Sequence, residues 1–192
     1  QRLHSSPFID FRGLLTHGGH SYDCGSRAAI ARVAEQERDV VVGFAKRLQA
    51  QGIPVPEVSV GSTPTMRVVD DLSGVTEIRP GNYVFFDVFQ SMIGSCTLDE
   101  VGFSVLTTVI GSYPDRNLVV VDAGALALSK DVGATHVDAS GGYGVVCDER
   151  GQPHRGMHLG SLSQEHGKIS VDGVVPAVGT LLRVMPNHSC LS

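Results

Sequence analysis

Apolar side chains recur at helical spacing over one long stretch in the first half of the chain. Between residues 26 and 52 they recur at the spacing of one face of an amphipathic helix. They are Ile30, Val33, Ala34, Val40, Val41, Phe44 and Leu48. Ser26 is a suitable N-cap and Gly52 suits the end of the helix. The pattern predicts one long helix whose opposite face is solvated.

Short apolar runs on both sides of this helix are typical of buried strands. We expect strands at 11–16, 54–60 and 75–79, and a short polar helix that reaches about residue 72. A further apolar and aromatic run follows at 83–89. Strands that alternate with helices favour βα units and a parallel sheet.

From about Gly94 onward the pattern changes to short strand-like runs separated by turn residues. We expect strands at 103–110, 118–121, 143–147, 169–171 and 180–184. No long amphipathic helix follows this point. The change predicts two domains, residues 1–95 and residues 96–192, with the boundary inside 92–102.

Composition narrows the class of protein. A formal charge of −5 argues against a nucleic-acid-binding surface, and no apolar run is long enough to span a membrane. The first seven residues lack the features of a signal peptide. The four cysteines form no CxxC pair, so we expect a reducing, cytoplasmic environment.

A loop rich in glycine and hydroxyl groups, residues 61–65, directly follows one predicted strand. Its backbone N–H groups and the hydroxyls of Ser62, Thr63 and Thr65 can converge on an anion at the start of a helix. The loop therefore predicts a phosphate site, although a helix-capping turn without a ligand has the same composition.

The turn that contains Gly81 and Asn82 comes one βα unit later. Loops after neighbouring strands of a (β/α) barrel meet at one face, where phosphates are often bound. The turn can therefore supply further N–H donors to the same phosphate. A simple turn before the next apolar run is the alternative.

The loop at residues 17–22 follows another predicted strand and carries His17, His20 and Tyr22 among glycines. Imidazole and phenol groups in such a loop can place a ring or a proton donor beside a cofactor. Exposed polar side chains without a function are the alternative.

His188 and Cys190 end the last apolar run. In an extended segment, side chains two positions apart point the same way, and imidazole nitrogen and thiolate sulfur are both good zinc ligands. Two ligands leave positions open for water and substrate. A chance pair is the alternative. His154, His158 and His166 are expected at the surface.

Six segments in fixed order carry a resemblance to a known family. They read HGGHSY, VSVGSTPT, EIRPGNYVFFD, VVVDAGALALSKD, SQEHG and PNHSC. Together they resemble the D-serine dehydratases and D-threonine aldolases, pyridoxal-phosphate enzymes of fold type III. The resemblance implies an α/β plus β fold, in which the C-terminal portion of a (β/α)8 barrel precedes an alanine racemase-like C-terminal β-domain.

The resemblance also implies roles for individual residues. The phosphate of pyridoxal 5'-phosphate would be held by Gly61, Ser62, Thr63, Gly81 and Asn82. Tyr22 would lie near the cofactor ring, as a cofactor-binding and catalytic residue. His188 and Cys190 would bind Zn²⁺ or another divalent metal that coordinates the β-hydroxyl of a D-amino acid. A homodimer is implied as well.

The catalytic lysine of the family has no counterpart here. That lysine forms a Schiff base on the first barrel strand, whereas the lysines of this chain are Lys46, Lys130 and Lys168, on a helix face and in turns. We therefore expect a fragment that lacks the N-terminal part of the enzyme.

Three functions remain open at this point. The first is D-serine dehydratase, which converts D-serine to pyruvate and ammonia, and Cys190 favours it because D-threonine aldolases more often carry aspartate there. The second is D-threonine aldolase, which yields glycine and acetaldehyde. The third is a non-catalytic cofactor-binding module.

Overall fold

The computed structural model describes residues 3–192, which form two compact units. The chain passes from the first unit to the second between Tyr83 and Val84. The two units have different architectures. Within the described residues, no helix is long and apolar enough to cross a membrane.

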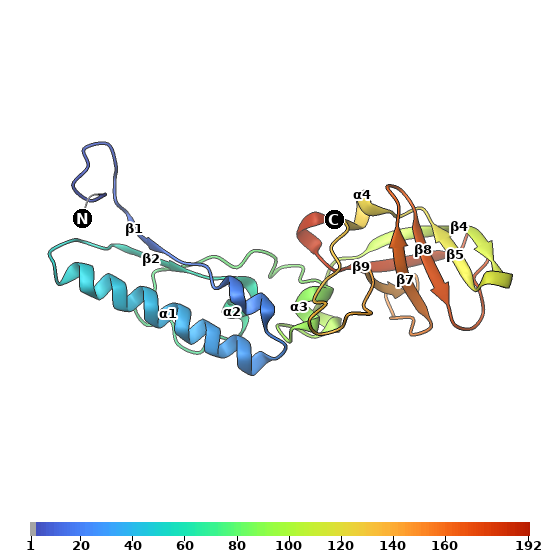
Figure 1. The fold of residues 1–192 in the computed structure, drawn as a ribbon, viewed down its shortest axis with the longest axis horizontal. Helices are drawn as coiled ribbons and strands as arrows, with labels where there is room; N and C mark the ends of the chain where they lie inside the picture. The colour runs from blue at the N-terminus through green and yellow to red at the C-terminus, as the bar shows by residue number, and fades with distance from the viewer. Residues whose placement is uncertain (1–2) are drawn as a thin grey trace. The chain divides into compact units, whose positions relative to one another are not determined.

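The first unit contains a parallel sheet whose strands pair in chain order. Its strands are β1 (Gly13–Leu15), β2 (Glu57–Val60) and β3 (Glu77–Ile78). Figure 1 labels the first two of these strands. The helix α1 (Arg27–Gln49) joins β1 to β2, and α2 (Thr63–Val68) lies between β2 and β3. This succession confirms the βα pattern expected from the sequence.

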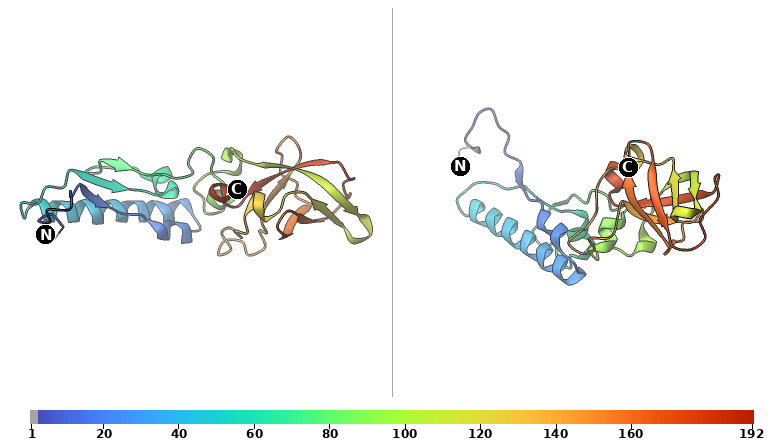
Figure 2. Two further views of the ribbon diagram at one scale, coloured as in Figure 1. Left: turned by 90° about the horizontal axis from the view of Figure 1, so that it is seen from above. Right: turned by 45° about the vertical axis from the view of Figure 1, so that its right-hand side comes forward.

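Capping and burial explain why α1 forms where it does. The Ser26 side chain accepts a hydrogen bond from the Ala29 N–H, which satisfies a backbone donor that the helix leaves free. Gly52 has a φ of 76°, a conformation that glycine adopts without strain. Both views in Figure 2 show α1 along one face of the sheet, where it buries Val41, Val42 and Ala45 against Val58 and Val60.

The second unit contains a six-stranded antiparallel sheet of order β6-β9-β4-β5-β8-β7. The strands are β4 (Val105–Tyr113), β5 (Leu118–Val121), β6 (Gly144–Cys147), β7 (Met157–Leu162), β8 (Gly167–Val171) and β9 (Leu181–Pro186). Alternate residues of these strands form the core, as in β5, where Val119 and Val121 are fully buried. Two short helices, α3 (Val88–Met92) and α4 (Ala125–Leu128), complete this unit with the short 3-10 turns.

The structure departs from the sequence analysis in three places. The strand β7 was not expected, because a register shift between Leu159 and Ser161 interrupts its alternation of buried and exposed side chains. The apolar and aromatic run at 83–89, to which the sequence assigned no element, contains the start of α3, because the Asp87 side chain accepts from the Gln90 N–H. The helix α2 ends at Val68 rather than near residue 72.

Candidate functional site

The carboxyl ends of β1, β2 and β3 bring three predicted segments together in the first unit. The loop at 17–22 follows β1, the loop at 61–65 follows β2, and the turn at 79–82 follows β3. Parallel strands in register place these segments at the same edge of the sheet. This edge is where parallel α/β folds bind their ligands.

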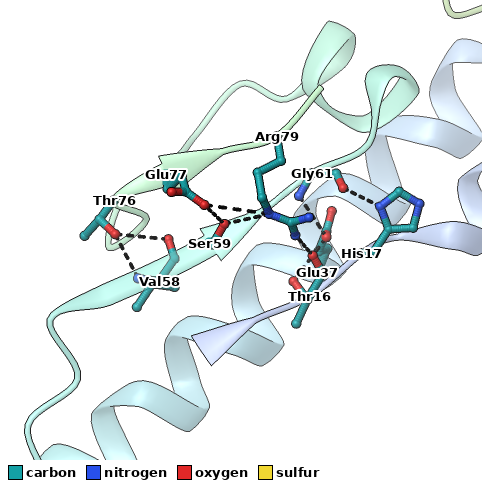
Figure 3. Close-up of polar contacts among 9 residues, drawn as sticks. All are labelled: Thr16, His17, Glu37, Val58, Ser59, Gly61, Thr76, Glu77 and Arg79. Atoms are coloured by element: carbon teal, nitrogen blue, oxygen red, sulfur yellow. Dashed lines mark hydrogen bonds and ion pairs between the residues drawn. The ribbon is translucent and has the colours of Figure 1, made fainter. Parts of the chain in front are cut away.

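A buried carboxylate joins two of these segments. Glu37, on α1, is only 6% exposed, and its Oε1 accepts from the Gly61 N–H and from the Thr16 hydroxyl, both at 3.1 Å. His17 Nδ1 lies 2.7 Å from the Gly61 carbonyl oxygen. Figure 3 shows Glu37 and His17 on either side of Gly61. Glu37 thus fixes the first residue of the β2 loop and uses its backbone donor.

Hydroxyl groups hold the rest of the β2 loop. Ser62 and Thr65 form a capping box, in which the Ser62 side chain accepts from the Thr65 N–H and the Thr65 hydroxyl accepts from the Ser62 N–H. The Ser62 hydroxyl also lies 3.2 Å from the Ser21 hydroxyl, in the loop after β1. The capping turn that the sequence left open is therefore present.

The turn after β3 contacts the same loop. The Asn82 N–H donates to the Thr63 hydroxyl over 3.0 Å. Gly81 is exposed, and a Cβ added there would meet no heavy atom within 4 Å. The structure thus joins the Thr63 loop directly to the Gly81 turn and leaves open space beside it.

Gly61 has a steric role in this arrangement. Its φ is +135°, and an added Cβ would lie 2.9 Å from the Arg79 backbone nitrogen. Only glycine tolerates both this conformation and this approach. Arg79 places a cation here, with its Nε donating to the Ser59 hydroxyl at 2.7 Å and its guanidinium also bonded to the Thr16 carbonyl oxygen.

Tyr22 belongs to the same group of residues. It lies in a 3-10 turn, Gly19–Asp23, and its ring stacks against that of His17 with 6.2 Å between centroids. His20 is exposed in that turn.

The lysines of the chain are all exposed: Lys46, Lys130 and Lys168. No lysine among residues 3–192 lies at the carboxyl ends of β1, β2 and β3, and Lys168 lies within β8 rather than in the expected turn.

The donor set at the strand ends fits a phosphate, with two changes from the expected contacts. The hydroxyls of Ser62 and Thr63 can turn to an anion, whereas the Asn82 N–H already donates to the Thr63 hydroxyl and leaves that O–H able to donate elsewhere. The Gly61 N–H is held by Glu37, so Gly61 contributes its conformation rather than a donor.

The predicted metal ligands lie in the second unit, just after β9. His188 Nδ1 is 2.9 Å from Asp131 Oδ2, and the His188 side chain is 40% exposed. Cys190 is exposed and free of disulfides. Ser189–Leu191 form a 3-10 turn, so the expected alternation of an extended segment does not apply to this pair.

The donor set fits an incomplete metal site. A histidine whose Nδ1 contacts a carboxylate presents Nε2 to a metal, and the sulfur of an exposed cysteine is a common zinc ligand. Residues 3–192 contain no cluster of three or more candidate ligands. The remaining positions would be open to water and substrate.

Four residues in these two places were not singled out by the sequence: Glu37, Arg79, Asp87 and Asp131. Glu37 looked like one more polar residue of α1. Asp87 and Asp131 each end one of the quoted segments, which was the available signal.

Comparisons with known proteins agree with this description. The family model described as "Putative serine dehydratase domain" matches residues 102–192. D-threo-3-hydroxyaspartate dehydratase from Delftia sp. (strain HT23) is 45% identical over 93% of this chain and 49% of its own length. D-serine dehydratase from Dictyostelium discoideum is 37% identical over 96% and 49%. The chain spans about half the length of these relatives.

Solved structures give the same match. A D-threo-3-hydroxyaspartate dehydratase, solved as a cysteine-to-alanine mutant in the metal-free form, has a TM-score of 0.88 at 43% identity, over 95% of this chain and 50% of that one. A histidine-to-alanine mutant of such an enzyme matches equally well. An alanine racemase-like protein from Idiomarina loihiensis has a TM-score of 0.89 at 39% identity, over 94% and 49%. The expected α/β plus β fold of the alanine racemase type is therefore confirmed.

Proposed function

Because the chain belongs to the family of D-serine dehydratases and D-threo-3-hydroxyaspartate dehydratases, we propose that the whole protein is a lyase that removes water from D-β-hydroxy amino acids. The products from D-serine are pyruvate and ammonia. Two relatives with these activities, at 45% and 37% identity, are the observation that carries the proposal.

Two groups would supply the chemistry. Pyridoxal 5'-phosphate, when bound, would act as an electron sink for the substrate Cα, and a divalent metal such as Zn²⁺ would act as a Lewis acid on the β-hydroxyl. The residues of this chain would bind and orient both groups. None of Lys46, Lys130 and Lys168 would be the Schiff-base lysine that the family requires, because all three are exposed and lie away from the carboxyl ends of β1, β2 and β3.

The cofactor phosphate would bind at the ends of β2 and β3. Ser62 and Thr63 would donate their hydroxyls and Gly81 its backbone N–H group, while Asn82, whose N–H donates to the Thr63 hydroxyl, would direct that hydroxyl to the phosphate. Gly61 would shape the turn, with its own N–H on Glu37. Tyr22 would line the ring, because its loop is tied to the same β2 loop through His17 and Ser21.

His188 and Cys190 would hold the metal. The residues replaced in the two mutant relatives are a histidine and a cysteine two positions apart, the same spacing as in this chain, and the structure of the cysteine mutant is described as metal-free. Imidazole and thiolate are suitable ligands for Zn²⁺, and the open positions would accept the substrate hydroxyl.

Dehydration is favoured over aldol cleavage by the sequence of the relatives. A D-threonine aldolase from Filomicrobium marinum has a TM-score of 0.76 at 21% identity, over 97% of this chain and 48% of that one, which demonstrates a shared fold only. The hydroxyaspartate relative is the more identical of the two dehydratases, so D-threo-3-hydroxyaspartate is the second candidate substrate.

Product analysis tests the proposal. The full-length protein, supplied with pyridoxal 5'-phosphate and Zn²⁺, is incubated separately with D-serine, D-threo-3-hydroxyaspartate and D-threonine. We expect ammonia with pyruvate from D-serine, or ammonia with oxaloacetate from hydroxyaspartate. Release of glycine and acetaldehyde from D-threonine, without ammonia from the other two, would make the protein an aldolase. No turnover of any of the three would favour a non-catalytic module.

We also propose a cytoplasmic homodimer. The cysteines among residues 3–192 form no disulfide, which supports a reducing compartment. The dimer rests on the family resemblance, and sedimentation of the full-length protein tests it.

A further inference from the structure

Asp131 ends the segment 119–131, which has no role in the function proposed above. Its carboxylate nevertheless faces the predicted metal ligand, with Oδ2 at 2.9 Å from His188 Nδ1. We propose that Asp131 is a positioning residue that selects the imidazole tautomer of His188 and so presents Nε2 to the metal. This inference rests on the proposed metal site.

The donor and acceptor roles in the contact between Asp131 and His188 determine the tautomer of the imidazole. An ionised carboxylate can only accept hydrogen bonds, so the proton of a neutral His188 must lie on Nδ1. The lone pair is then on Nε2, and no residue in the described part of the chain engages that atom. Metal-binding histidines commonly use their second nitrogen in this way, which fixes the ring and raises its basicity.

The loop that carries Asp131 is built to hold its carboxylate in place. The other carboxylate oxygen, Oδ1, accepts from the Gly133 N–H at 2.7 Å, which leaves Oδ2 directed at the imidazole. The Asp131 N–H donates to the Ser129 hydroxyl, and Ser129 has a φ of 58°, which costs energy in a residue other than glycine. Such strain persists only where neighbouring contacts maintain it.

A second link ties the two chain segments through their backbones. Asn187, next to His188 and 2% exposed, donates from Nδ2 to the carbonyl oxygens of Asp131 and Gly142, both at 2.9 Å. Gly133 has a φ of +70°, and a Cβ there would lie 3.0 Å from the Asn187 Cγ. The Asp131 loop is therefore held against the ligand segment independently of the imidazole contact.

The residue on the other side of His188 is also fixed. The Ser189 N–H donates to Oδ2 of Asp87 at 3.1 Å, and Asp87 is 2% exposed. Both chain neighbours of His188 thus have fixed partners, so the ring can change only by rotation of its own side chain. Asp131 is the group that limits this rotation and selects the protonated nitrogen.

The test compares variants of the full-length protein. Asp131→Ala removes the acceptor, and Asp131→Asn retains an acceptor oxygen without the charge. The matched control is Asp138→Asn, which alters an exposed aspartate that caps Ser140 in the same connection between β5 and β6. Zn²⁺ affinity is measured by competition with a chromophoric chelator. The tautomer is assigned from ¹⁵N shifts of labelled histidine in metal-free protein near pH 8.

We expect Asp131→Ala to weaken Zn²⁺ binding by roughly 10- to 100-fold and to shift the His188 proton toward Nε2. Asp131→Asn should fall between wild type and the alanine variant, because the amide oxygen can still accept from Nδ1. Asp138→Asn should match wild type in both measurements. Equal Zn²⁺ affinity and an unchanged tautomer in Asp131→Ala would overturn the inference.

Cys190→Ser separates this failure from failure of the proposed function. If Cys190→Ser loses Zn²⁺ while Asp131→Ala binds it like wild type, the metal site stands and the role of Asp131 is wrong. If Cys190→Ser keeps full Zn²⁺ affinity, the metal assignment itself is wrong and the inference falls with it.

Discussion

At the scale of single residues, the conformation of the loop after β2 depends on contacts with residues that lie far away in the sequence. Gly61 is bounded by the Arg79 backbone and by Glu37, which lies 24 positions earlier on α1. The glycine was predicted to contribute to a phosphate site. Its backbone donor nevertheless goes to a carboxylate, so its contribution is steric.

The steric role of Gly61 predicts an ordering of two glycine variants. Both Gly61 and Gly52 have positive φ, but an added Cβ clashes with the backbone only at Gly61. Gly52→Ala should lower the free energy of unfolding by about 1 kcal/mol, and Gly61→Ala by about 2–4 kcal/mol. Chemical denaturation of the full-length protein measures both. Equal losses would mean that the contact with Arg79 is not limiting.

At the scale of elements, the pairing of β4 with β5 shows how a side chain can stabilise an irregular ladder. The register of β4 shifts between Val109 and Gly111. Asp122, just after β5, accepts from the Thr107 hydroxyl at 2.6 Å and from the Thr108 N–H at 2.8 Å. The hydrogen bond from the Thr107 hydroxyl has the larger effect, and together with the bond from the Thr108 N–H it holds the pKa of Asp122 below its ordinary value.

The lowered pKa predicts a loss of stability in acid. Because the folded-state pKa is lower than the unfolded-state value of about 4, the stabilisation is complete above pH 4 and is lost as pH falls through the folded-state pKa. Asp122 is exposed, so the effect should stay below about 1 kcal/mol. Asp122→Asn should therefore reduce the difference between urea midpoints at pH 7 and pH 3.

Asp115→Asn is the control, since Asp115 is exposed in a turn between the same two strands. It should leave the difference between the two midpoints as in wild type. If Asp122→Asn keeps the same difference between the two midpoints as wild type, the contacts with Thr107 and Thr108 contribute nothing measurable.

At the scale of the whole molecule, the chain combines a parallel α/β unit with an antiparallel β unit, and each carries one proposed binding function. The residues proposed to bind the phosphate lie before Tyr83, and those proposed to bind the metal lie after Val84. The proposed reaction needs both groups on one substrate. A substitution that removes either the cofactor or the metal should therefore abolish turnover, while the other group stays bound.

The separation is tested with two kinds of variant in the full-length protein. Ser62→Ala with Thr63→Ala should weaken pyridoxal-phosphate affinity about tenfold or more and leave Zn²⁺ content unchanged. Cys190→Ser should lower Zn²⁺ content and leave the visible absorbance of the cofactor unchanged. Loss of turnover is expected in both cases. Normal cofactor retention in the double variant would remove the phosphate assignment.

Because Ser62 also caps α2, the double variant can lose stability as well as donors. Thr63→Val avoids this problem, since it keeps the volume of a buried side chain and removes only the hydroxyl. It should weaken cofactor binding in the same direction, with a denaturation midpoint closer to that of wild type.

The sequence by itself determined the elements whose signals are local. Helical spacing and the Ser26 cap predicted α1, and a short apolar run between turn residues predicted β5, because both patterns arise from neighbours within a few positions. The order of short segments also predicted the fold class and the family. The strand β7 escaped because its bulge breaks the alternation that reveals a strand.

Only the tertiary structure decided which polar groups meet. Glu37 and Gly61 are 24 positions apart, Asp131 and His188 are 57 apart, and Asp87 and Ser189 are 102 apart. No spacing rule relates such pairs, because their contact depends on strand register and on how loops close over the sheets. The ligand residues could be predicted from short local motifs. The partners that orient those residues are determined by tertiary packing.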